Sequence, residues 1–165
     1  MTQSLTENIT KIFAAEPIAE GCCASSGRWL LRADGDRDIT IKEGASVELL
    51  ILGGAAVSNI NIDVCAGAQL RIVELVTERS ATEIAIAVAR DASCVMTQAV
   101  LSDADVRVVA SLVEEGAHFE HNGAFILVGE EQGSVTVDVN HMSPRCTSRT
   151  TVKGVAADRA HGSFS

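Results

Sequence analysis

Cysteine is the residue type of this chain best suited to bind a soft metal ion, because its thiolate is a strong metal ligand. The five cysteines, Cys22, Cys23, Cys65, Cys94 and Cys146, contain no C-x-x-C pair, and their odd number suggests no disulfide framework. The adjacent pair is the strongest thiol candidate. Neighbouring strand residues point to opposite faces, however, and this pair precedes the repeats of the chain. We therefore expect no ligation by the pair and packing roles for the other three cysteines.

Two histidines next to acidic residues are the second candidate for metal chemistry. His118 and His121 stand three positions apart, beside Glu114, Glu115 and Glu120. In a strand this spacing places the two rings on opposite faces, so a shared metal would need a turn between them. Carboxylates without a fixed ligand geometry usually form a solvated surface. We predict solvated or partly packed histidines and assign no metal here.

The closing segment SVTVDVNHMSPRCTSRTTVKGVAADRAHGSFS interrupts strand alternation with a polar corner. His141 is in phase with Val137 and Val139, so its ring is predicted to face the interior, where an imidazole needs a hydrogen-bond partner. Small polar groups on the following strand, such as the Ser148 hydroxyl, are the predicted partners. Pro144 lies between His141 and Ser148, lacks an N–H for a strand ladder and presets a bend. This pattern favours a structural corner over a catalytic or ligand site.

Motifs of common enzyme chemistries are absent from the sequence. There is no Gly-rich phosphate loop, no G-x-S-x-G elbow and no pair of carboxylates on one strand face. An aromatic content of 3% leaves no surface for stacking sugars or bases, and a net charge of -9 does not suit nucleic acid. We expect neither enzyme activity nor a nucleic-acid partner.

One helix followed by strands is predicted to position these residues. Ser4 and Glu7 have the spacing of a capping box, and an apolar face follows them up to Pro17, which is expected to end the helix. From Arg28 onward the apolar period becomes two, as in the stretch NINIDV, which is typical of strands with one buried face. The predicted organisation is an N-terminal helix and lead-in over 1–27 and a β core over 28–165.

A similar small turn recurs along the core. Its copies begin at residues 44, 67, 91 and 116, in steps of 23, 24 and 25 residues, and each is followed by a strand. A repeat of this length made only of short strands favours an all-β fold, a parallel β-helix in which each coil covers the apolar face of the previous one. A β-sandwich is the main alternative, although it requires no such recurrence.

The closing segment also resembles the SufB/SufD family of iron–sulfur cluster assembly scaffold proteins. The matching pattern is an apolar strand running into His, then Pro, Ser, Lys-Gly-Val and a late Phe. In this chain it comprises Val139, His141, Pro144, Ser148, Lys153, Gly154, Val155 and Phe164. With the coils from Gly44 onward, the resemblance covers roughly three quarters of the chain. It implies a right-handed parallel β-helix in a cytoplasmic complex that builds clusters, with a SufC-like ABC-type ATPase and a SufB or SufD paralogue as partners.

The resemblance leaves some family features without a counterpart. The Cys and His that the family uses at the SufB–SufD interface, and the helices that grip the ATPase, lie in later segments and match no residue of this sequence. We therefore expect a scaffold module that is not catalytic on its own, with an iron–sulfur cluster implied only for the whole complex. The alternatives are a truncated β-helix paralogue acting as a structural or interaction module, and a carbohydrate-active or acyl-transferring β-helix enzyme.

The sequence also suggests where the protein works. No signal peptide and no apolar run of the roughly 18 residues that cross a bilayer is present, so we expect a cytoplasmic protein without a membrane partner. A solenoid that stops at a coil with unpaired apolar rows predicts end-to-end association, and hence a possible homo-oligomer through the β-helix.

Overall fold

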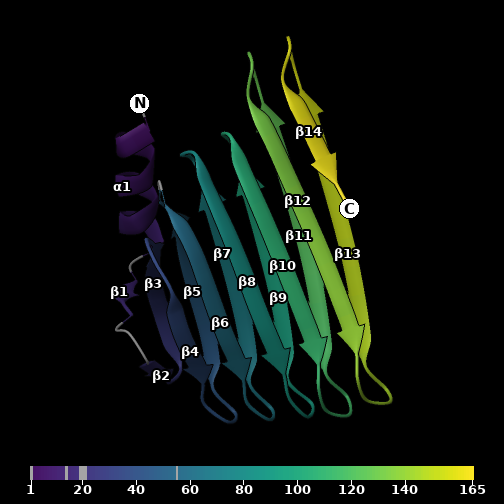
Figure 1. Cartoon of the computed structure of the whole chain (residues 1–165). Coiled ribbons are helices and arrows are strands. Elements are labelled where there is room, and N and C mark those ends of the chain that lie inside the picture. Colours follow the sequence, from purple (N-terminus) through teal and green to yellow (C-terminus); the bar gives the residue numbers. More distant parts are fainter. Residues whose placement is uncertain (1, 14, 19–21, 55) are drawn as a thin grey trace.

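The computed structural model describes residues 2–13, 15–18, 22–54 and 56–165 (Figure 1). Helix α1 (Thr2–Phe13) precedes two sheets of seven strands each. The odd-strand sheet consists of β1 (Glu16–Pro17), β3 (Gly27–Ala33), β5 (Ser46–Gly53), β7 (Gln69–Val76), β9 (Ser93–Val100), β11 (His118–Leu127) and β13 (Thr147–Ala156). The even-strand sheet consists of β2 (Cys22–Ala24), β4 (Arg37–Ile41), β6 (Val57–Val64), β8 (Ser80–Val88), β10 (Ala104–Leu112), β12 (Gln132–His141) and β14 (His161–Phe164).

Successive strands alternate between the two sheets, and neighbours within each sheet pair in parallel. Each coil therefore gives one strand to each sheet, and Figure 1 shows the coils stacked side by side along the molecule. This arrangement confirms the predicted parallel β-helix. It excludes the β-sandwich because, among the described strands, neighbours pair in parallel and none pairs with its successor in the chain.

Stacked rows of aliphatic side chains fill the interior. Val47, Leu70, Cys94 and Phe119 are register partners on β5, β7, β9 and β11, and all four are buried. Burying a side chain of this size contributes about 1.5–3 kcal/mol, and in a parallel stack each coil supplies that burial to its neighbour. Alternation of apolar and polar residues along each strand is what keeps these rows inside.

The recurring turns lie where an even strand passes into the next odd strand. A residue with positive φ occupies the same place in each turn: Gly44 (66°), Gly67 (66°), Asp91 (53°), Gly116 (77°) and Arg145 (58°). The first four are the predicted repeats, which the structure confirms. The fifth, at Arg145, escaped the sequence pattern because its coil is longer and carries Arg where other copies carry Gly or Asp.

The N-terminal segment differs from the prediction in three respects. Helix α1 begins at Thr2, so it starts two residues before the predicted capping residue Ser4. The helix ends at Phe13, whereas Pro17 is the second residue of β1 and pairs with Leu30. Cys23 pairs with Thr40 of β4, so the cysteine pair belongs to the first coil instead of preceding the coils. The domain boundary at residue 28 stays a prediction.

Helix α1 adjoins the first coils of the odd-strand sheet (Figure 1). The Arg28 guanidinium lies 5.8 Å from the centre of the Phe13 ring, which joins the end of the helix to β3. Among the described residues no helix has the length and apolar character needed to cross a membrane.

Candidate functional site

The polar corner of the closing segment joins β12 of one sheet to β13 of the other. His141 ends β12, and its Nε2 lies 2.9 Å from the Ser148 hydroxyl oxygen of β13, so the predicted hydrogen bond is present. Both side chains are exposed, however, and the predicted burial of the ring is wrong. The reason is that β14 pairs only with residues 132–135 of β12, so none of the described strands covers His141.

The turn between these strands is anchored to the preceding coil. The Ser143 hydroxyl donates to the Val113 carbonyl at 2.8 Å, and the Arg145 guanidinium lies 2.7 Å from the Glu115 carboxylate. The Cys146 thiol donates to the Glu114 carbonyl at 3.2 Å. Pro144 is exposed within this turn. These contacts fix the position of the turn on the coil beneath it.

The glycine of the Lys-Gly-Val segment makes room for an aromatic ring. A methyl group added at Gly154 or Gly162 would overlap the ring of Phe125, so both positions require the absence of a side chain. Lys153, by contrast, is exposed. Phe164 pairs with Val135 and is 47% exposed. Among the residues of the family pattern, Gly154 is therefore explained by the Phe125 ring, which occupies the space that a side chain would need.

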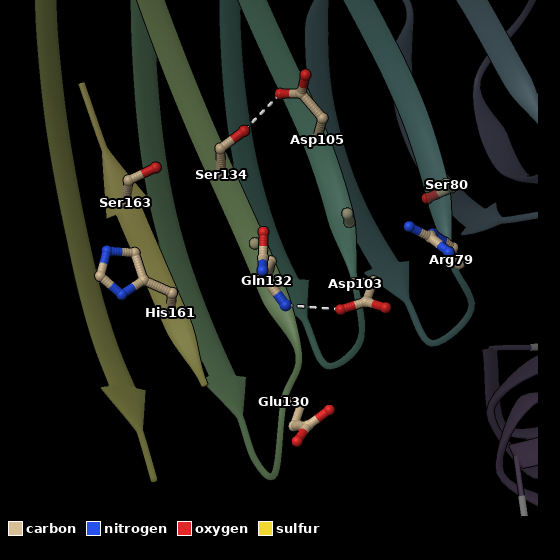
Figure 2. A pocket seen from close by; sticks show the side chains of 11 residues that line it. Arg79, Ser80, Asp103, Asp105, Glu130, Gln132, Ser134, His161 and Ser163 are labelled. Atoms are coloured by element: carbon tan, nitrogen blue, oxygen red, sulfur yellow. Dashed lines mark hydrogen bonds between the residues drawn. The ribbon is translucent and has the colours of Figure 1, made fainter. Parts of the chain in front are cut away.

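An open groove of about 520 Å³ runs along the ends where the later even strands begin (Figure 2). Three acidic side chains that line it already form hydrogen bonds or ion pairs with other residues of the chain. Asp103 accepts a hydrogen bond from the Gln132 N–H at 2.6 Å, and Asp105 accepts one from the Ser134 hydroxyl. Glu130 forms an ion pair with Arg159. These contacts join adjacent coils, so we assign no ligand to the groove.

The two histidines of β11 do not share a site. His118 is half-buried, with Nδ1 2.9 Å from the Thr147 hydroxyl oxygen, whereas His121 is fully buried. The predicted opposite faces are therefore present, but the prediction of solvated or partly packed histidines is wrong for His121. Within the described part of the chain, no group of three or more His, Cys, Asp or Glu side chains could hold a metal ion.

The described cysteines are free thiols in different surroundings. Cys23 is exposed, and the side chain of Cys22 lies outside the described residues. Burial raises the pKa of the Cys94 thiol to about 12, which disfavours the thiolate and suits the predicted packing role. Burial also raises the pKa of Cys65, with a further contribution from Asp63.

The comparison that decides the family covers most of the β-helix. A family model described as SUF system FeS cluster assembly, SufBD core domain, matches residues 18–165. The chain belongs to the SufBD core domain family. Membership confirms the resemblance drawn from the closing segment and gives the chain a role in iron–sulfur cluster assembly by the SUF system. Comparisons with curated proteins and with solved structures gave no match.

This SufBD core domain also contains buried polar residues that the sequence analysis missed. Glu74 and Gln98 are 1% exposed, and the Gln98 amide donates to Glu74 Oε2 at 2.6 Å. A signal was present in the sequence: each residue continues an inward-facing alternation, after Leu70 and Ile72 in one strand and after Cys94 in the other. The same alternation places His121 inside.

Proposed function

We propose that this SufBD core domain is a scaffold module of SUF iron–sulfur cluster assembly that carries out no chemistry on its own. The observation that supports it most is the family match over residues 18–165, because SufBD proteins are assembly components of the SUF system. The engaged carboxylates of the groove and the raised pKa of the buried Cys94 thiol fit a structural role for these groups.

The proposed interaction surface is the last coil. Among the described strands, β13 and β14 are the terminal ones of their sheets, and no described strand pairs with their outer edges. Apolar side chains on and near this coil are open to solvent: Met142 is 67% exposed, Val155 62% and Phe164 47%. An unpaired strand edge beside exposed apolar groups is the usual template for adding a strand from another chain.

The free edge of β13 can be defined by its N–H groups. Thr147 donates to the Ala117 carbonyl and Ala157 donates to the Leu127 carbonyl, so the odd-numbered residues between them donate toward β11. The even-numbered residues, including Thr150, therefore direct their N–H groups to the unpaired edge. We propose a SufB or SufD paralogue as the chain that pairs there, with a second copy of this chain as the homotypic equivalent.

We propose a SufC-like ATPase as a further member of the complex, which binds the paralogue and does not contact this chain directly. We place the assembly in the cytoplasm, which accords with the free thiols at the four cysteines that the structure describes as unpaired.

An interaction module without cluster chemistry is the remaining alternative. It predicts that the chain associates with partners without changing the amount of bound iron or sulfide.

The experiment is anaerobic co-expression of the chain with a SufC-like ATPase and a SufB or SufD paralogue. Capture through a tag on this chain is expected to retain both partners, and the captured complex is expected to contain more iron and acid-labile sulfide than the chain alone. Capture of the partners with no added iron or sulfide would favour the interaction module, and failure to capture either partner would contradict the proposal.

A further inference from the structure

Five polar side chains are buried inside the β-helix, each 3% exposed or less: Ser58, Glu74, Thr82, Gln98 and His121. We call this set the polar belt. It lies between two separate apolar clusters of the interior, one containing Ile72 and Ile84 and the other containing Val76 and Val106. Val137, which is half-buried, packs against both clusters, so the polar belt separates them only in part.

On the odd-strand sheet, three residues of the polar belt form one row: Glu74, Gln98 and His121. Glu74 and Gln98 are register partners, and Gln98 is in turn the partner of Gly123. A methyl group at Gly123 would lie 2.8 Å from Cε1 of His121, so the imidazole leans over this glycine into the row. Carboxyl, amide and imidazole groups thus follow one another over three adjacent coils.

The even-strand sheet supplies the facing hydroxyls. Ser58 and Thr82 are register partners on β6 and β8, and both point inside. Glu74 stands two residues before the end of β7, and Thr82 stands two residues after the start of β8. Because the chain turns back between these strands, the coil places Thr82 across the interior from Glu74.

Most polar atoms of the polar belt have no protein partner. The unpartnered atoms are Glu74 Oε1, Gln98 Oε1, both ring nitrogens of His121 and the hydroxyls of Ser58 and Thr82. Buried polar groups in folded proteins are nearly always hydrogen-bonded, to ordered water where no protein group is available, because an unsatisfied group is strongly unfavourable. These atoms therefore require hydrogen-bond partners other than protein groups.

The mixture of groups identifies the class of ligand. Glu74 and Gln98 offer acceptor oxygens, whereas a neutral imidazole must offer one N–H donor and the hydroxyls offer both functions. A cation would leave the donors unsatisfied, and the Glu74 carboxyl disfavours an anion. A neutral molecule that both donates and accepts fits the whole set. We propose that the polar belt binds ordered water molecules that link Glu74 and Gln98 to Thr82, Ser58 and His121.

The isosteric variant Thr82→Val tests the proposal, because the proposal predicts whether the melting temperature falls or rises. If the hydroxyl binds water, the variant loses those hydrogen bonds, and the melting temperature is expected to fall by about 2–4 °C. If the hydroxyl is unsatisfied, its removal raises the melting temperature. Thr40→Val, at a half-buried position on the outer face of β4, is the matched control and is expected to change little. An unchanged or raised melting temperature for Thr82→Val would overturn the proposal.

A second measurement detects the water directly. Oxygen-17 relaxation dispersion of the solvent is expected to show water molecules that stay on the wild-type protein longer than a microsecond, and fewer of them on the folded double variant Ser58→Ala/Thr82→Val. The proposal requires both results. Absence of long-lived water on the wild type, or an equal number on the double variant, would also overturn it.

Discussion

At the scale of the residue, the tightest constraint in the closing segment is steric. Gly154 and Gly162 face the ring of Phe125, which leaves no room for a side chain at either position. The sequence places Gly154 in the family pattern but gives no reason for it, because the ring that requires the glycine comes from a different coil. The predicted partner of His141, in contrast, followed from strand parity alone and is confirmed.

Replacing this glycine tests the contact. Gly154→Ala is expected to lower the free energy of unfolding by about 1–3 kcal/mol, because the added methyl group forces the Phe125 ring out of its position. Urea unfolding measures the loss. The matched control is Gly154→Ala introduced into a Phe125→Leu background, where the smaller side chain leaves space. Equal losses in both backgrounds would show that the ring is not the cause.

Glu74 and His121 predict opposite effects of pH on stability. Burial raises the pKa of Glu74 from 4.5 to about 7, so its contribution is full below pH 4.5 and is lost as the pH rises through 7. Burial lowers the pKa of His121 from 6.5 to about 4, so its contribution is full above pH 6.5 and is lost as the pH falls toward 4. Between about pH 4.5 and 6.5 the two effects oppose each other.

Single variants separate these two titrations. Relative to the wild type, Glu74→Gln is expected to lose stability on acidification from pH 7.5 to 5, because only the His121 effect remains. His121→Leu is expected to gain stability over the same interval, because only the Glu74 effect remains. Urea unfolding at both pH values measures the differences. Identical pH dependence in wild type and variants would mean that neither group is perturbed in the folded state.

At the scale of the element, the repeated turn is the feature of the sequence that predicts the coils. The copies beginning at residues 44, 67, 91 and 116 predicted coils, and the structure shows that their shared requirement is one residue with positive φ. Gly meets that requirement without strain, and Asp91 shows that a short polar residue is also accepted. The turn at Arg145 could not be predicted this way, because Arg is not a residue typical of positive φ.

Substitution in a turn tests this requirement. Gly67 has a φ of 66° and open space where a Cβ would lie, so Gly67→Ala is expected to cost about 1–2 kcal/mol through backbone strain alone. Gly67→Asn is expected to cost less, because Asn adopts positive φ more readily. Thermal unfolding of the two variants gives the comparison. A larger loss for Asn than for Ala would contradict the proposed cause.

The first coil marks the limit of prediction at this scale. Period-two alternation identified the long strands of the core, but β1 and β2 have two and three residues and are too short for any period to be visible. Their places in the sheets depend on pairing with β3 and β4, which are contacts between coils. The fold class was therefore predictable, whereas the start of the solenoid was not.

At the scale of the whole molecule, the β-helix and its SufBD family were both accessible from the sequence, the first from the repeat and the second from the closing segment. The polar belt was not predicted, because a single inward-facing Glu or Gln resembles a local exception until the register stacks it on a second one. The proposed scaffold role also belongs to this scale, since it depends on the surfaces that the last coil presents.

The most direct test of the scaffold proposal is native mass spectrometry of the chain mixed with a SufB or SufD paralogue, comparing wild type with Thr150→Pro. Proline removes the N–H that Thr150 directs to the unpaired edge and leaves the ladder to β11 intact, a position where strands tolerate it. Thr150→Val, which keeps the N–H, is the control.

We predict that wild type and Thr150→Val form a complex with the paralogue, and that a folded Thr150→Pro protein does not. Equal complex formation by all three would contradict pairing through the last coil, and no complex with any of them would contradict the scaffold role.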